Sequence, residues 1–190
     1  MNIKEELINY VPYNEREQKD KELILECIDK FPDIFYRSNN MAHMTASAWV
    51  TNKNHTKILM AYHNIYDSFS WLGGHCDGNE NCLEVAINEV KEESGIKTVK
   101  AISNEIFSIE ALTVDGHIKK GEYVSSHLHL NITYLLEADD SEELRIKKDE
   151  NSDVKWFDFD KAVEASNEKW FRDNVYSKLN RKLKEYYENN

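Results

Sequence analysis

Residues 71–96, WLGGHCDGNENCLEVAINEVKEESGI, decide the fold of this chain. A glycine-rich turn leads there into residues 81–94, whose apolar spacing predicts a helix. Glu89, Glu92 and Glu93 span about 100° of that helix, at about 100° per residue. Like charges one turn apart destabilise a helix by roughly a few tenths of a kcal/mol per pair. The three carboxylates therefore predict a positive partner among them.

Hard divalent cations, such as Mg²⁺, Mn²⁺ or Ca²⁺, are suitable partners because they prefer oxygen ligands. A solvated acidic face is the alternative, since glutamate pairs also occur at residues 5–6 and 142–143. The glycines favour the metal. The chain has only six, and four of them bracket this segment: Gly73, Gly74, Gly78 and Gly95. Gly73-Gly74 can turn tightly and bring carbonyls close to a ligand, while Gly95 follows the helix as a natural cap.

In this register the segment resembles the signature of the Nudix hydrolase superfamily, G-x5-E-x7-R-E-U-x-E-E-x-G-U, where U is a bulky aliphatic residue. Eight of the nine specified positions match, namely Gly74, Glu80, Glu89, Val90, Glu92, Glu93, Gly95 and Ile96. The ninth departs, because Asn88 stands where the family has an arginine that commonly pairs with a motif carboxylate. Asparagine can form hydrogen bonds but carries no charge, so we expect an active, slower enzyme.

The resemblance implies a Mg²⁺- or Mn²⁺-dependent pyrophosphohydrolase that cleaves the diphosphate linkage of a small nucleoside diphosphate-X compound. Metals in such enzymes neutralise phosphate oxygens and lower the pKa of the attacking water. By resemblance, the metal ligands are Gly74, Glu89, Glu92 and Glu93, and the three glutamates are catalytic. The motif residues with a structural role are Gly73, Glu80, Asn88 and Gly95.

Many family members place one more carboxylate on a distant loop, as a base or a metal ligand. Glu150 is our candidate for a catalytic residue of this kind, since it lies six residues before Trp156 at the mouth of the last predicted strand. Asp149 and Asp153 are rival candidates. The alternative for Glu150 is a solvated loop residue.

Histidines provide candidate substrate-binding groups. Residues 126–138, SHLHLNITYLLEA, alternate as a strand does, with His127 and His129 on the polar face. Both are candidates to line a substrate cleft, and His75, just after the glycines, can contact a phosphate or cap the loop. A solvent-facing polar stripe is one alternative. An H-x-H transition-metal pair is another, but no carboxylate supports it at short spacing.

The remaining segments predict an α+β fold, which the resemblance specifies as a Nudix-type α/β/α sandwich with a mixed β-sheet. Helical spacing is present at residues 13–31 and 169–187. Strands are predicted at residues 43–53, 56–63, 69–72, 98–114, 126–138 and 153–159. Residues 1–40 are predicted to be an N-terminal helical extension packed on the domain, because no linker follows it. Residues 41–190 are predicted to be the Nudix hydrolase domain.

Composition limits the partners. The formal net charge of −11 disfavours nucleic acid and anionic membranes, whereas a small nucleotide can be held through bound cations. No apolar run approaches the roughly 20 residues of a membrane span. The N-terminus has no apolar signal segment, so a cytoplasmic location is expected. Three cysteines without a CxxC pair predict reduced thiols. The sequence does not decide whether the protein forms a homodimer.

The alternative function is a non-catalytic nucleotide-sensing or scaffold protein on a degenerate Nudix fold. Asn88 favours it, whereas the intact glutamates argue against it. The lack of cysteine between Cys27 and Cys76 argues against an isopentenyl diphosphate isomerase. Markers of ADP-ribose pyrophosphatases and of dinucleoside polyphosphate hydrolases are not evident. The TASAW and HLHLN strands also resemble a bacterial Nudix group, which leaves the substrate open.

Overall fold

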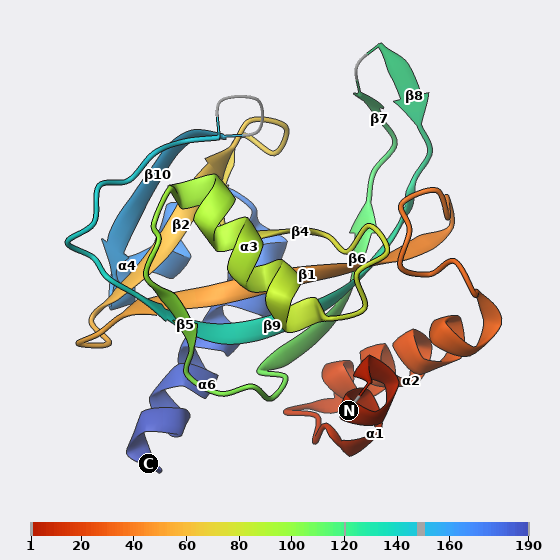
Figure 1. Ribbon diagram of the computed structural model, residues 1–190, viewed down its shortest axis with the longest axis horizontal. Helices are drawn as coiled ribbons and strands as arrows, with labels where there is room; N and C mark the ends of the chain where they lie inside the picture. The colour runs from red at the N-terminus through yellow and green to blue at the C-terminus, as the bar shows by residue number, and fades with distance from the viewer. Residues whose placement is uncertain (1, 120, 148–150, 190) are drawn as a thin grey trace. The chain divides into compact units, whose positions relative to one another are not determined.

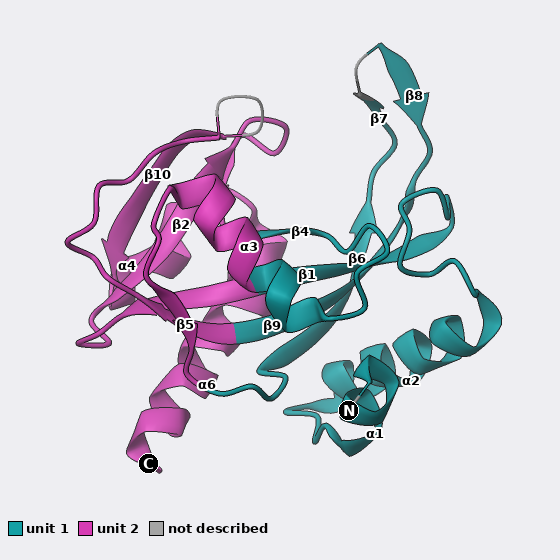
Figure 2. Ribbon diagram, viewed as in Figure 1, with its two compact units in different colours: residues 1–47, 73–86, 103–134 teal, residues 48–72, 87–102, 135–190 magenta. Residues whose placement is uncertain are grey.

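The computed structural model describes residues 2–119, 121–147 and 151–189 of the 190-residue chain. The chain forms two compact units (Figures 1 and 2). Unit 1 comprises residues 1–47, 73–86 and 103–134, and unit 2 comprises residues 48–72, 87–102 and 135–190. Four elements contribute residues to both units, namely β1 (Ala42–Asn52), β4 (Leu72–His75), α3 (Cys82–Ser94) and β9 (His127–Ala138).

Unit 1 joins two N-terminal helices to strands of the sheet. Its further elements are α1 (Ile3–Asn9), α2 (Glu15–Lys30), β6 (Ser108–Val114), β7 (His117–Lys119) and β8 (Glu122–Val124). Strand β6 pairs antiparallel with β9, from Ser108 opposite Thr133 to Val114 opposite His127. Strands β7 and β8 form a separate antiparallel pair. Helix α2 packs on β6, and the side chain of Asn14 caps its first turn.

Unit 2 is organised around β2 (Lys57–His63), which pairs antiparallel with β3 (Ser68–Ser70), β10 (Asn151–Asp158) and the end of β1. Strand β5 (Val99–Ala101) pairs with the end of β9. The C-terminal elements are α4 (Phe159–Ala165), α5 (Lys169–Phe171), the π-helical turn η1 (Arg172–Tyr176) and α6 (Ser177–Glu188). The hydrogen-bonded order of the main sheet is β10-β2-β1-β9-β5.

Most of the predicted elements are confirmed, with bounds that shift by one or two residues. Two of the predicted strands each correspond to two strands in the structure. The strand expected at residues 69–72 is divided into β3 and β4, and that at 98–114 into β5 and β6. A turn separates β5 from β6, where the Glu105 amide donates to Ser103 Oγ at 3.1 Å. The sequence analysis missed α4 and the β7–β8 pair. In the part of the chain that is described, every helix is too short or too polar to cross a membrane.

The polar face of β9 is buried rather than solvent-facing at two of its positions. Asn131 and Thr133 are both almost fully buried. Their side chains donate to Glu110 Oε2 on β6, at 3.1 and 3.0 Å. Asn131 Oδ1 in turn accepts hydrogen bonds from Thr45 and Ser47 on β1, at 3.0 and 2.8 Å. Each polar group is therefore satisfied inside unit 1, as burial requires. For these two residues the solvent-facing alternative is wrong.

A buried carboxylate connects α2 to the same set of strands. Glu17 is fully buried and accepts hydrogen bonds from the Tyr10 hydroxyl at 2.6 Å and the Tyr13 amide at 2.7 Å. Its other oxygen accepts from Ser108 Oγ on β6 at 3.0 Å. Hydrogen bonds to a charged group contribute about 1.5–3 kcal/mol each. Glu17 therefore fixes the N-terminal helices on the sheet within unit 1.

Substitution of this carboxylate is expected to be costly. Glu17→Ala should lower the free energy of unfolding by about 2–3 kcal/mol, because it leaves buried donors without an acceptor. Glu15→Ala is the control, since Glu15 is exposed in the same helical turn and carries the same charge. Its effect should stay below about 0.5 kcal/mol. Urea denaturation of both variants measures the difference, and equal losses would contradict the role of the buried contacts.

Candidate active site

Helix α3, which is labelled in Figure 1, carries the three signature glutamates near its C-terminal end. Glu93 is 4% exposed, the Glu89 side chain is mostly buried, and the Glu92 side chain is 60% exposed. Gly95 follows the helix with φ +74°, a left-handed conformation, and its amide donates to the Lys91 carbonyl at 2.9 Å. The helix therefore ends immediately after the carboxylates. Asn88 has an exposed side chain.

A lysine of unit 2 lies among these carboxylates. Lys147 Nζ is 3.3 Å from Glu92 Oε2 and 3.9 Å from Glu89 Oε2. Its side chain is 26% exposed, so the two ion pairs are only partly screened by water. The positive partner that the helix predicts is thus supplied by an ammonium group. Sequence reasoning missed this residue, although two lysines at residues 147–148 before the last predicted strand were an available signal.

Asn151, at the start of β10, positions the buried glutamate. Its Nδ2 donates to Glu93 Oε1 at 3.1 Å, and its amide donates to the Lys147 carbonyl at 2.8 Å. Asn151 Oδ1 is buried and has no hydrogen-bond partner among the described residues. Carboxylate and amide oxygens are the ligands that hard divalent cations prefer. These side chains therefore fit Mg²⁺ or Mn²⁺, with Lys147 as a competitor for the same place.

The other predicted site residues are placed differently. Glu150 and its rival Asp149 lie outside the described residues. Asp153 is on β10, where its carboxylate pairs with Lys155 at 2.7 Å. Gly73, Gly74, His75 and the exposed Glu80 belong to unit 1, whereas the three glutamates of α3 belong to unit 2. A Cβ on Gly73 would meet Ser47 Oγ at 2.4 Å and the Ala46 carbonyl at 2.6 Å, so only glycine allows this close approach of β4 to β1.

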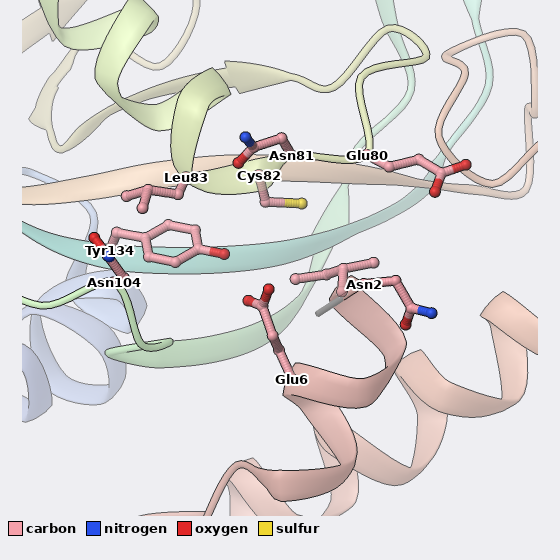
Figure 3. Close-up of a pocket in the computed structure, with 9 residues that line it drawn as sticks. Asn2, Glu6, Glu80, Asn81, Cys82, Leu83, Asn104 and Tyr134 are labelled. Atoms are coloured by element: carbon pink, nitrogen blue, oxygen red, sulfur yellow. The ribbon is translucent and has the colours of Figure 1, made fainter.

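Glu80 lines a pocket of about 410 Å³ in unit 1 (Figure 3). The lining also includes Glu6 and Tyr134, and the free thiol of Cys82. Cys82 Sγ lies 3.8 Å from Cys76 Sγ, and the hydrogen bond between the two thiols, together with burial, raises the pKa of Cys82. Among the described residues, the pocket lining contains two carboxyl groups and a neutral thiol, and it contains neither lysine nor arginine to attract a phosphate.

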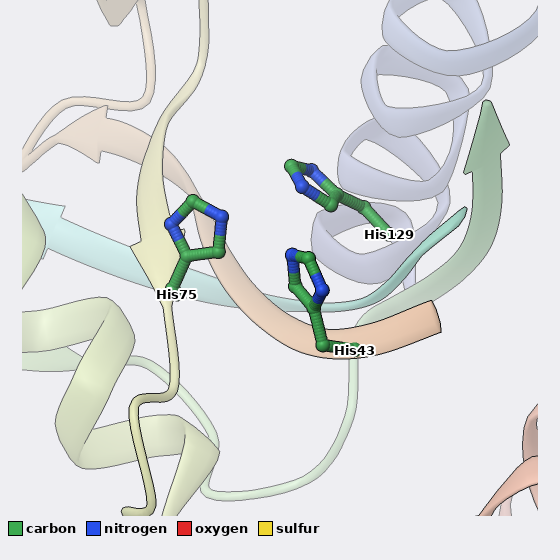
Figure 4. Close-up of side chains that lie close together, drawn as sticks. All are labelled: His43, His75 and His129. Carbon is green, nitrogen blue, oxygen red and sulfur yellow. The ribbon is translucent and has the colours of Figure 1, made fainter. Parts of the chain in front are cut away.

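The predicted histidines gather in unit 1 around a fourth one, His43. Figure 4 draws His43 with two of them, His75 and His129. The ring centroids of His75, His127 and His129 lie 5.0, 4.8 and 4.9 Å from that of His43. His43 is 3% exposed, and its Nδ1 donates to the Asn39 carbonyl at 3.0 Å. Burial lowers the pKa of His43, so the ring is neutral at neutral pH.

Sequence reasoning missed His43. The signal was available in the alternation of β1, where His43, Thr45 and Ser47 share one face, as the polar residues of β9 do. Nothing in either strand alone indicates that the two polar faces meet. The side chains of Thr45 and Ser47 contact Asn131 of β9, which places His43 in the same row of β1 as residues already paired with that strand.

Comparisons with known proteins agree on one family. A family model of the NUDIX domain matches residues 41–179. A C. elegans Ap4A hydrolase, crystallised as a binary complex, is similar in structure with a TM-score of 0.52 and 17% identity, covering 77% of this chain and 98% of that chain. A NUDIX-family hydrolase from Clostridium perfringens gives 0.54 and 22%, with 76% and 97% covered. No curated protein matches this chain.

At these identities the two crystal structures show the fold alone. They confirm the predicted Nudix fold, α+β with a mixed sheet. The family model covers most of the chain, including the whole glutamate helix and the strands that flank it. The chain therefore belongs to the NUDIX family, and the predicted enzyme class, Nudix hydrolase, is confirmed with it.

Proposed function

We propose that this Nudix hydrolase is a Mg²⁺- or Mn²⁺-dependent pyrophosphohydrolase that cleaves the diphosphate linkage of a small nucleoside diphosphate-X compound. The observation that carries the proposal is the set of oxygens on and beside the end of α3. Glu89, Glu92 and Glu93 supply carboxylates, and Asn151 adds a buried amide oxygen without a partner among the described residues. When bound there, the metal neutralises phosphate oxygens and lowers the pKa of the attacking water.

The residues of α3 have distinct parts in this proposal. The side-chain amide of Asn151 donates a hydrogen bond to Glu93, so the Glu93 carboxylate is oriented before any ligand arrives. Glu92 is the most exposed of the three and is paired with Lys147, which must move when a cation binds. Gly74 is proposed as a further ligand through its carbonyl, from its place in the signature. Glu80 and Asn88 keep the structural roles that the signature assigns to their positions.

Glu150 is proposed as the additional catalytic carboxylate. Its support comes from the described residues on either side of 148–150. Lys147 contacts Glu92, and Asn151 contacts Glu93. The chain on both sides of Glu150 is thus anchored to signature glutamates. Asp153, the described rival, is already paired with Lys155, which supports the choice of Glu150.

Substrate contact is proposed for His75, His127 and His129. Their support is that the three side chains lie together in unit 1, next to the signature glycines. A small nucleotide is the proposed partner, because the net charge of −11 disfavours nucleic acid and requires cations around a phosphate. We further propose a cytoplasmic location, and the proposal is compatible with either a monomer or a homodimer.

Hydrolysis of a nucleotide panel in the presence of Mg²⁺ tests the function. The panel holds oxidised and normal nucleoside triphosphates, ADP-ribose, NADH, dinucleoside polyphosphates, nucleotide sugars and CoA. Glu92→Gln and Glu93→Gln should each lower kcat by about 100-fold or more, because a metal ligand contributes several kcal/mol to the transition state. Glu84→Gln, the same change on the same helix at a position that the signature does not specify, should keep the activity of the parent.

The opposite outcome identifies the alternative function. A parent protein that binds nucleotides without turnover in any reaction of the panel would be a sensing or scaffold protein on a degenerate Nudix fold. Retained turnover in both glutamine variants would instead remove the catalytic glutamates from the proposal.

Asn88→Arg is expected to raise kcat by about tenfold. An arginine at this position lies one turn before Glu92, where a charge-assisted hydrogen bond can hold that carboxylate in place. A gain of this size corresponds to about 1.4 kcal/mol of transition-state stabilisation. Asn88→Lys is the control, because it adds the charge without the planar fork of guanidinium donors. An equal gain in both variants would show that charge alone is responsible.

Lys147→Met distinguishes the stabilising effect of the lysine from that of a bound metal ion. Without added metal, this variant should lose about 1 kcal/mol of stability, because Glu89 and Glu92 lose their counter-ion. With millimolar Mg²⁺, its gain in Tm should exceed that of the parent, because the competing ammonium is gone. Lys161→Met, which removes an exposed ion pair with Glu164, is the control. A smaller Mg²⁺ gain than in the parent would show that Lys147 assists the metal instead.

A further inference from the structure

His43 presents a nitrogen lone pair to the histidine cluster. Its Nδ1–H donates to the Asn39 carbonyl, so the lone pair of the neutral ring is on Nε2. Nε2 is buried and has no hydrogen-bond partner in the part of the chain that is described. Leaving such a group unsatisfied costs about 1–3 kcal/mol. The cost is avoided if an electron-pair acceptor occupies the cluster.

Three strands direct one ring each to a common point (Figure 4). Possible ligand atoms of His43 on β1, His75 on β4 and His129 on β9 all lie within 4.8 Å of one another. An ion at the centre of a triangle with that side would be about 2.8 Å from each nitrogen, against a Zn–N bond of about 2.0–2.1 Å. Inward movements of at most roughly 0.7 Å per ring therefore complete three bonds.

His127 provides a further nitrogen, at a matching distance from one ring of the group, His129. Its Nε2 lies 3.2 Å from His129 Nε2, and its Nδ1 donates to the Ser125 carbonyl at 2.8 Å. Two nitrogens on one tetrahedral Zn²⁺ ion are about 3.3 Å apart. His43 and His127 thus both donate the other ring N–H to a backbone carbonyl, which is how the second contact of a metal-bound histidine is usually arranged.

The chemistry of the four rings selects the kind of ion. Imidazole nitrogens suit Zn²⁺, Co²⁺, Ni²⁺ and Cu²⁺, whereas Mg²⁺ prefers oxygen. A hydrogen bond between His127 and His129 would satisfy that pair without an ion. It would still leave Nε2 of His43 buried without a partner among the described residues.

We propose that His43, His75 and His129 bind a divalent transition-metal ion of the Zn²⁺ type, with His127 as the fourth ligand. This site goes beyond the proposed function, because its ligands and its ion differ from those of the α3 glutamates. The ligands come from β1, β4 and β9, so the bound ion joins three strands of unit 1. A Zn²⁺-dependent gain in thermal stability follows from that linkage.

Co²⁺ titration of the chelator-treated protein tests the site directly, since Co²⁺ in a four-coordinate nitrogen site absorbs strongly in the visible range. We expect one Co²⁺ per chain, displaced by one Zn²⁺. His75→Gln and His129→Gln should each weaken binding by at least about 100-fold, because loss of an outer-shell partner alone costs about 10–100-fold. His117→Gln is the matched control, as this histidine lies on β7 outside the cluster.

Three outcomes would overturn the site. The parent fails to bind Co²⁺; or both cluster variants bind it like the parent; or Glu92→Gln and Glu93→Gln abolish the visible absorbance, which would move the ion to α3. Cluster variants that keep Co²⁺ affinity but lose nucleotide binding would restrict these histidines to direct substrate contact. The readout does not use hydrolysis, so it stands whether or not the proposed activity is found.

Discussion

The constraint on which the rest depends is the repulsion among three carboxylates on one turn of α3. Such a cluster near the negative C-terminal end destabilises a helix, and a cation beside it offsets that cost. Lys147 supplies one, and Asn151 holds Glu93 from the neighbouring strand. The loop before β10 is thereby fixed at both described ends by α3. The same contacts, from Lys147 to Glu92 and from Asn151 to Glu93, both stabilise the fold of this part of unit 2 and determine the electrostatics of the candidate site.

Unit 1 solves a different electrostatic problem. It buries two carboxylates, Glu17 and Glu110, each of which accepts hydrogen bonds from hydroxyl and amide donors. Such a network is stable only when every member is satisfied, and this one extends from α2 through β6 to β9 and β1. Thr45, a member of this network on β1, follows His43 by two residues on the same face of that strand. The buried polar network and the histidine cluster are therefore neighbours on the same strand face.

Local patterns predicted much of this structure because their causes are local. The α3 glutamates, the cap at Gly95 and the alternation of β9 depend on helical or strand period alone. Lys147 and His43 escaped prediction because their roles depend on partners distant in sequence. Alternation likewise identified the polar face of β9 but could not indicate that Glu110, on β6, covers Asn131. Site residues at 148–150 stay predictions.

The ammonium of Lys147 has a consequence for metal occupancy. It is a tethered competitor, present beside Glu89 and Glu92 at a fixed effective concentration, which for short tethers is about millimolar or higher. In the proposed metal site a divalent cation has to displace this ammonium, so the apparent affinity of the carboxylates for the cation is weaker than their charge suggests. Occupancy of the proposed site then follows the free metal concentration instead of being permanent. In this way one lysine outside the family signature sets a threshold below which the acidic helix end carries its own counter-ion.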